Sequence, residues 1–171
     1  MNYFFGNISF AFVILLFNIT THAQTSSDYV KSGIIKEQTG NFAGAIAEYD
    51  KAIKINPKDS HAYFNRGNAN YKSKNLKAAI TDYDTAIAIN PKDVNAYLNR
   101  ALAKYQLSNF TGAISDYDKI ITINPKLAVA YLGRGNAKDE LKDNSGACAD
   151  WHKASELGEK KADETIQHLC K

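Results

Sequence analysis

The sequence is poor in the residues that usually build metal-bound, covalent or charge-driven sites. It has two cysteines and, beyond residue 23, three histidines; no two of these histidines stand at a metal-ligand spacing, and none clusters with a cysteine. The net charge of +3 is mild and the charges are interspersed, which argues against a nucleic-acid surface. No Ser/His/Asp or Cys/His arrangement recurs, and no linker divides off a second domain that would host one. We therefore expect no cofactor, no metal, no nucleic-acid partner and no enzymatic activity.

Proline is also scarce, but its three occurrences are regular. Pro57, Pro91 and Pro125 stand 34 residues apart, and each closes an Ile-Asn-Pro phrase. When residues 60–93 are superimposed on residues 94–127, about half of the positions are identical. A period of this length is typical of stacked helix–turn–helix units. The sequence therefore predicts a repeat array rather than a single core.

The apolar residues within one unit have helical spacing. They recur at steps of three and four, which places them on one helix face: Ala79, Ile80, Tyr83, Ala86 and Ile87. The helices are expected to break at residues 40–41, 74–75 and 108–109. Each unit ends at its Asn-Pro because proline disfavours helix in the residue before it. One helix pair cannot bury its own apolar face, so neighbouring pairs must cover it.

This framework of small residues, aromatics and a closing proline resembles that of tetratricopeptide (TPR) repeat proteins. The resemblance covers four consecutive units, at about residues 26–59, 60–93, 94–127 and 128–158. It implies an all-α fold, a right-handed α-solenoid of four helix–turn–helix repeats. The third unit departs at Ile120, which replaces the usual small residue. The fourth lacks the closing proline and carries Asn144 where the other units have Phe42, Leu76 and Phe110.

The first 23 residues have the character of an export signal. An unbroken apolar run extends from Phe10 to Phe17, and Thr21-His22-Ala23 offers a small-residue cleavage site before Gln24. The run is short for a membrane span of about 20 residues. We expect residues 1–23 to be a cleaved signal peptide, leaving residues 24–171 as an exported, periplasmic or secreted TPR domain without a membrane span. Because no Lys or Arg precedes the run, an uncleaved anchor and a plain cytoplasmic protein remain alternatives.

The last residues break the period and predict a cap. Residues 159–171 place Ala162, Ile166 and Leu169 on one stripe of an amphipathic helix, which can cover the open end of the stack. Cys170 lies on this helix. Cys148 is the equivalent, in the fourth unit, of Ile46, Ile80 and Ile114 in the first three units. This position lies on the face that is expected to pack on the next helix. In an oxidising compartment these two cysteines are expected to form a disulfide; the alternative is two buried free thiols.

The resemblance also implies a concave groove lined by the first helices of successive units. Amide side chains there can hold a peptide backbone, and apolar and aromatic side chains supply most of the binding energy. The alternative for the asparagines is hydrogen bonding within turns or to water. The expected groove residues are His61, Phe64, Asn65, Asn68, Tyr71, Asn95, Leu98, Asn99, Leu102, Tyr105, Leu132 and Asn136.

Two anion-binding interpretations are weaker. Some TPR domains hold a C-terminal carboxylate with a lysine, an asparagine and further basic residues; here Asn65 fits, but the basic places hold Val30, Asn95 and Asn99. A column of arginines shares its period with aspartates, which favours a ladder of inter-helix ion pairs over an anion site. Its members are Arg66, Arg100 and Arg134, with Asp82, Asp116 and Asp150, and with Asp84 and Asp118.

The resemblance thus predicts a non-catalytic scaffold that binds a peptide segment or partner protein in the groove. The alternative is a structural protein of the cell envelope that self-associates, for example through its open N-terminal edge. The sequence leaves the oligomeric state open.

Overall fold

A computed structural model describes residues 24–170, and within this part the chain forms helices joined by short turns, without strands. The helices are α1 (Ser26–Gln38), α2 (Phe42–Ile55), α3 (Ser60–Lys72), α4 (Leu76–Ile89), α5 (Val94–Gln106), α6 (Phe110–Ile123), α7 (Ala128–Glu140), α8 (Asn144–Glu156) and α9 (Lys160–Leu169). The predicted signal peptide, residues 1–23, lies outside the described residues.

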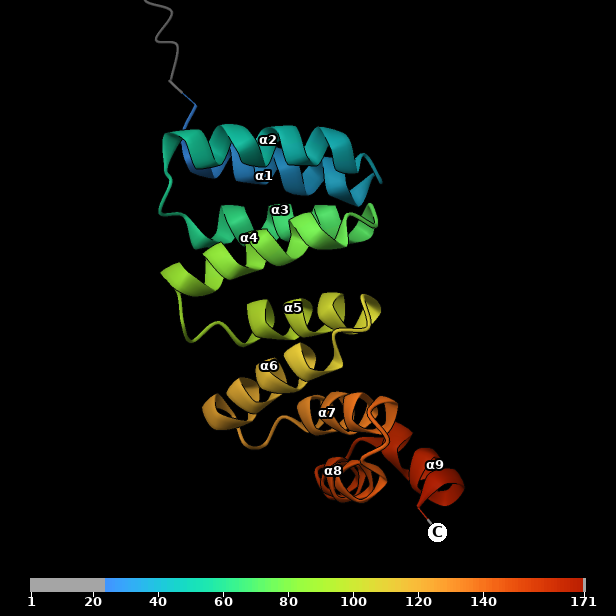
Figure 1. Ribbon diagram of the computed structural model, residues 1–171. Helices are drawn as coiled ribbons and strands as arrows, with labels where there is room; N and C mark the ends of the chain where they lie inside the picture. The colour runs from blue at the N-terminus through green and yellow to red at the C-terminus, as the bar shows by residue number, and fades with distance from the viewer. Residues whose placement is uncertain (1–23, 171) are drawn as a thin grey trace, which may run out of the picture.

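The helices pack in chain order as four antiparallel pairs. Each pair stacks on the next, from α1–α2 at one end to α7–α8 at the other, and α9 packs on α8 (Figure 1). Contacts of α1 with α3 and of α3 with α5 place the first helices of successive pairs in one row. The predicted all-α solenoid with a C-terminal capping helix is confirmed. Over the described residues, none of the helices combines the length and apolar character needed to cross a bilayer.

The turn inside each repeat uses one left-handed residue at the same column. Backbone φ is 78° at Gly40, 65° at Lys74, 57° at Ser108 and 65° at Lys142. Glycine adopts this conformation without strain, whereas a residue with a Cβ atom is disfavoured by about 1 kcal/mol or more. The helix breaks predicted from the sequence fall at these corners.

A small residue on the first helix of a pair faces an aromatic ring on the second. A Cβ added at Gly67 of α3 would lie 2.7 Å from the Tyr83 ring of α4. The last pair repeats this arrangement, because a Cβ at Gly135 would lie 2.7 Å from Trp151. Both rings are buried. Close helix contact therefore depends on the missing side chain.

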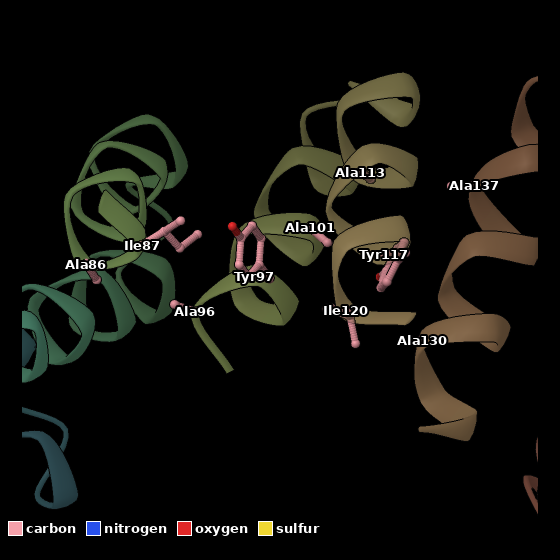
Figure 2. Close-up of a cluster of buried hydrophobic side chains, with 10 residues drawn as sticks. All are labelled: Ala86, Ile87, Ala96, Tyr97, Ala101, Ala113, Tyr117, Ile120, Ala130 and Ala137. Atoms are coloured by element: carbon pink, nitrogen blue, oxygen red, sulfur yellow. The ribbon is translucent and has the colours of Figure 1, made fainter. Parts of the chain in front are cut away.

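The third helix pair, α5–α6, has no glycine at the position where the first helix faces the aromatic ring. Its small position is Ala101, and the ring of Tyr117 lies over Gly133 of the next repeat, where an added Cβ would be 2.6 Å from the Tyr117 hydroxyl. Figure 2 shows Tyr117 on α6, on the side that faces α7, with Ala130 and Ala137 on that neighbouring helix. The two repeats are thus joined by a ring that contacts the backbone of the next first helix.

The capping helix is held by one apolar contact region and one covalent bond. Ala162 is fully buried, and Ile166 packs with it against Trp151. The sulfur atoms of Cys148 and Cys170 lie 2.05 Å apart in a disulfide, which agrees with the pairing expected from the sequence. Leu169, expected in the same stripe, is 54% exposed; at this last turn Cys170 contacts the cluster in its place.

Candidate functional site

The residues predicted to line a groove lie on α3, α5 and α7, the first helices of successive repeats. They combine exposed side chains at the outer positions with half-buried ones deeper in. The exposed ones are His61, Asn95, Leu102 and Asn136, and the half-buried ones are Phe64, Asn65, Asn68, Tyr71, Leu98, Asn99, Tyr105 and Leu132.

Two of the groove asparagines form a polar triad with a buried tyrosine. The Tyr83 hydroxyl donates to Asn68 Oδ1 at 2.8 Å, and Asn99 Nδ2 donates to the same oxygen at 2.8 Å. Burial raises the pKa of Tyr83 well above its ordinary value, so this hydroxyl stays protonated and can donate. Asn68 and Asn99, both predicted groove residues, therefore hold the helix stack together.

The remaining asparagines differ in their hydrogen bonds. Asn136 Oδ1 accepts from Trp151 Nε1 at 2.9 Å, which repeats the bond between Asn68 and Tyr83. The side chains of Asn65 and Asn95 make no hydrogen bond to any other residue in the range 24–170. Asn65 thus offers an uncommitted donor and acceptor to a bound molecule.

An apolar pocket of about 350 Å³ opens between α5 and α7. Its lining residues are Leu98, Leu102, Tyr105, Tyr117, Val129, Leu132, Gly133 and Asn136. The sequence analysis did not name Tyr117, Val129 or Gly133 as groove residues. Val129 follows Asn95 by one period and Gly133 follows Asn99 by one period, so both were detectable by extending the groove columns into the fourth unit.

Contacts along the groove edge link the first helices to one another. Lys72 Nζ lies 2.7 Å from Glu37 Oε1, and the Tyr105 hydroxyl donates to Glu140 Oε1 at 3.0 Å. Each of these pairs is separated by 35 residues. An alignment of the repeats at intervals of 34 residues does not reveal these pairs. Each pair joins a residue of one repeat to the residue one position after its equivalent in the next repeat. They fix the spacing of the helices that line the groove.

The predicted ion-pair ladder is confirmed. Arg66 lies 2.6 Å from the buried Asp82 of its own repeat and 2.5 Å from the exposed Asp50 of the preceding one. The same two bonds recur at Arg100 with Asp116 and Asp84, and at Arg134 with Asp150 and Asp118. The sequence analysis missed Asp50, although it belongs to the column of Asp84 and Asp118.

The arginine electrostatics agree with this structural role. Burial alone would lower the pKa of the Arg66 guanidinium, but hydrogen bonds to Asp82 and Asp50 raise it above its ordinary range. Its donors are directed at these carboxylates rather than at an open anion site. Across residues 24–170, no three His, Cys, Asp or Glu side chains lie together as metal ligands; the expectation of no metal remains a prediction.

Comparison with known proteins gives one family. Residues 37–74 and 71–108 match the family described as TPR repeat, and residues 94–127 match the one described as tetratricopeptide repeat. Together the matches span more than half of the chain. No curated protein sequence matches significantly.

Solved structures share the fold. A crystal structure of MamA is 29% identical, with a TM-score of 0.76 over 81% of this chain and 81% of that one. The first TPR of Spaghetti (RPAP3), bound to the HSP90 peptide SRMEEVD, is 24% identical with a TM-score of 0.65, over 70% of this chain and 97% of that one. TTC0263, a thermophilic TPR protein in Thermus thermophilus, is 21% identical with a TM-score of 0.64, over 78% and 75%. The last two support the fold alone.

Proposed function

We propose that this chain, which belongs to the tetratricopeptide repeat family, binds a partner polypeptide in the groove of α3, α5 and α7 without catalysing a reaction. TPR repeats generally act as interaction modules, and the RPAP3 structure holds a peptide. A rigid stack presents its side chains in fixed positions, so the protein loses little conformational entropy when a flexible segment binds.

This proposal rests on one observation: exposed apolar side chains, and an asparagine side chain that bonds no described residue, lie together on the first helices of the repeats. Leu102 is 39% exposed and Val129 is 38% exposed, and both border the pocket between α5 and α7. Asn65, one helix away, has no hydrogen-bond partner among the described side chains and backbone groups. Grouped exposed apolar residues beside polar ones are typical of protein-interaction sites.

The chemistry of the groove disfavours an acidic C-terminal peptide as the partner. The peptide bound by RPAP3 is acidic, whereas the places that would supply basic residues here hold Val30, Asn95 and Asn99. Lys72, which borders a smaller cavity of about 260 Å³, is engaged with Glu37. We therefore propose that the partner segment is held through its backbone and its apolar side chains.

Photo-crosslinking tests whether the groove is the contact surface. A benzoylphenylalanine placed at Asn95 in the groove is expected to cross-link the partner, while one at Ser115, exposed on α6, serves as the matched control. The cross-linked partner segment, identified by mass spectrometry, is then synthesised and its binding measured by calorimetry. Cross-linking from Ser115 but not from Asn95 would contradict the proposal.

Asn65→Ala tests the backbone contact with the synthesised segment. Loss of one hydrogen bond is worth about 1 kcal/mol, or about a fivefold loss of affinity. The melting temperature should stay unchanged, because Asn65 bonds no other described residue. Asn68→Ala is the comparison, since removing the acceptor of Tyr83 should lower stability as well. Unaltered affinity of the Asn65→Ala protein would remove this contact from the proposal.

We also propose that the protein is exported, with residues 1–23 as its signal peptide. The disulfide between Cys148 and Cys170 is compatible with an oxidising compartment. The choice between periplasm and extracellular medium is testable by fractionating cells and reading the N-terminus of the recovered protein.

One observation favours self-association as a second candidate function. Ile35 is 62% exposed, while the residues of its column in later repeats, Ala69, Ala103 and Ala137, are fully buried against the preceding pair. No described helix covers this face of α1. Light scattering on residues 24–171 would detect a dimer, and Ile35→Glu should dissociate it. A monomer at high concentration would rule this candidate out.

A further inference from the structure

The third repeat lacks the polar triad that the second repeat has. In the second, the Tyr83 hydroxyl is paired with Asn68, which also binds Asn99. One period later, Tyr117 keeps the ring, but Leu102 stands in place of Asn68 and Gly133 in place of Asn99. Both asparagines of the triad are therefore missing at the position of the apolar pocket.

Among the described residues, none forms a hydrogen bond with the Tyr117 hydroxyl. Tyr117 is only 2% exposed, yet its hydroxyl bonds no other residue within 24–170. The described structure contains no fully enclosed side-chain polar atom without a partner, so this hydroxyl must reach an open surface. Tyr117 and Gly133 both line the apolar pocket, and a Cβ added at Gly133 would lie 2.6 Å from the Tyr117 hydroxyl, which places this hydroxyl at the pocket wall.

The pocket has an apolar wall, and among its described lining residues Tyr117 is the buried one whose polar group has no partner. Leu102 and Val129 are more than one-third exposed and form the rim, whereas Tyr117 is almost fully buried and forms the floor. Of the other polar groups in the lining, the Tyr105 hydroxyl donates to Glu140 and Asn136 Oδ1 accepts from Trp151, whereas Nδ2 of the exposed Asn136 bonds no described residue. A ligand that fills the pocket has to satisfy a hydroxyl at its base, because a buried polar group without a partner is unfavourable.

The size and chemistry of the pocket match one kind of side chain. Its volume of about 350 Å³ accommodates an aromatic ring. Tyrosine combines an apolar ring with a hydrogen-bonding tip, and its hydroxyl can both donate and accept. Leucine and phenylalanine fill the space but leave Tyr117 unpaired. No charged side chain lines the pocket, which disfavours a charged ligand.

Building on the groove function proposed above, we propose that this pocket binds a tyrosine side chain of the partner polypeptide. The ring lies among Leu98, Leu102 and Leu132, and its hydroxyl forms a hydrogen bond with Tyr117. The pocket then selects segments that contain a tyrosine, whereas Asn65 contacts the peptide backbone whatever the sequence of the segment.

The test uses N-acetyl-L-tyrosinamide and N-acetyl-L-phenylalaninamide as probes, followed by NMR on the intact, disulfide-bonded protein. The tyrosine probe should give saturable shifts at the Gly133 amide and the Leu102 and Leu132 methyl groups. We expect it to bind about fivefold more tightly than the phenylalanine probe, the difference made by one neutral hydrogen bond. Equal affinities, or shifts mainly outside these residues, would overturn the proposal.

Two variants complete a double-mutant comparison. Tyr117→Phe should abolish the preference for the tyrosine probe while retaining binding of the phenylalanine probe. The matched control is Tyr83→Phe, since that hydroxyl is already bonded to Asn68 and its loss should leave the preference intact. If Tyr117→Phe fails to fold, Leu102→Asn replaces it, because it supplies the acceptor found in the second repeat and should weaken both probes. A preference that persists in these variants would exclude Tyr117.

The outcomes separate this inference from the groove function itself. A partner that cross-links at Asn95 through a segment without tyrosine would refute the tyrosine pocket and leave the groove function standing. Binding of the tyrosine probe at Gly133 with a partner that cross-links only at Ser115 would refute the groove function and retain the pocket. If light scattering shows that the bound polypeptide is a second copy of this chain, the pocket is assigned to self-association and the proposed partner is wrong.

Discussion

Arg66 and Arg100 occupy the same column of successive repeats, but their buried carboxylate partners are not equally supported. Asp82 is contacted by Arg66 and by the neutral amide of Asn70 at 2.9 Å. Asp116 is contacted by Arg100 and by a second cation, Lys104, at 2.9 Å. Among the described residues, removing the arginine therefore leaves Asp82 without a cationic partner and Asp116 with one.

The difference sets the expected loss of stability. Removing one partner of a buried ion pair destabilises by about 3 kcal/mol or more, because the remaining charge is buried without compensation. We expect Arg66→Met to cost about 3 kcal/mol. A charged hydrogen bond contributes about 1.5 kcal/mol or more, so the retained Lys104 should reduce the cost of Arg100→Met to about 1.5 kcal/mol. The outer contacts with Asp50 and Asp84 are exposed and contribute little.

The other interactions lost in Arg66→Met and Arg100→Met are nearly the same. Each guanidinium also lies over a tyrosine ring, at 5.5 Å for Tyr63 and 5.3 Å for Tyr97, so the lost cation–π contacts nearly cancel. Methionine keeps the apolar stem of the arginine in both variants. The free energy of unfolding is measured by urea titration followed by circular dichroism, with Lys104→Met in the Arg100→Met background as the check. Equal losses for the two single variants, or no further loss on removing Lys104, would refute the reasoning.

Three further predictions concern the cap, the floor of the pocket and the N-terminus. Replacing Cys148 and Cys170 by serine opens a 22-residue loop and should cost up to about 3 kcal/mol, seen as faster amide exchange in α9 with unchanged exchange in α3; unaltered protection of α9 would contradict it. Burial raises the pKa of Tyr117 from 10.0 to about 12, so the contribution of this pKa shift to stability is complete below pH 10 and is lost as the pH rises to about 12. The urea midpoint should therefore fall less steeply between pH 10 and pH 12 in Tyr117→Phe than in the wild-type protein. Parallel pH curves for the two proteins would contradict this prediction. N-terminal sequencing of the exported protein should begin at Gln24, whereas an intact Met1 would indicate a retained anchor.

The fold was predictable because its information is repeated along the chain. The spacing of Pro57, Pro91 and Pro125 gives the register, and the boundaries of helices α1 to α7 recur at this interval. Corner residues such as Lys74 lie where the sequence placed the breaks, although their side chains do not favour the left-handed backbone. The stack determines these conformations, and local propensity does not.

The candidate site was predictable in position and only partly in chemistry. The repeat alignment placed the predicted groove residues on α3, α5 and α7, and the apolar pocket lies between α5 and α7. It treated Asn68 and Asn99 as ligand contacts, whereas Asn68 also accepts hydrogen bonds from both Asn99 and Tyr83. The sequence could not show that Tyr117 lies over Gly133 of the next repeat, because Tyr83, the equivalent tyrosine one period earlier, lies over Gly67 of its own repeat. Contacts that join non-equivalent residues of neighbouring repeats can be recognised only in the three-dimensional structure.

The substitution of two polar residues by Leu102 and Gly133 has a consequence for how such proteins diversify. In an array whose units touch only their neighbours, a gene duplication that copies residues 60–93 would lengthen the polar stretch and leave the apolar pocket intact. Conversely, a few point mutations in such a copy would create a second pocket one period away. New binding preferences are therefore accessible by small genetic steps that leave the curvature of the array unchanged.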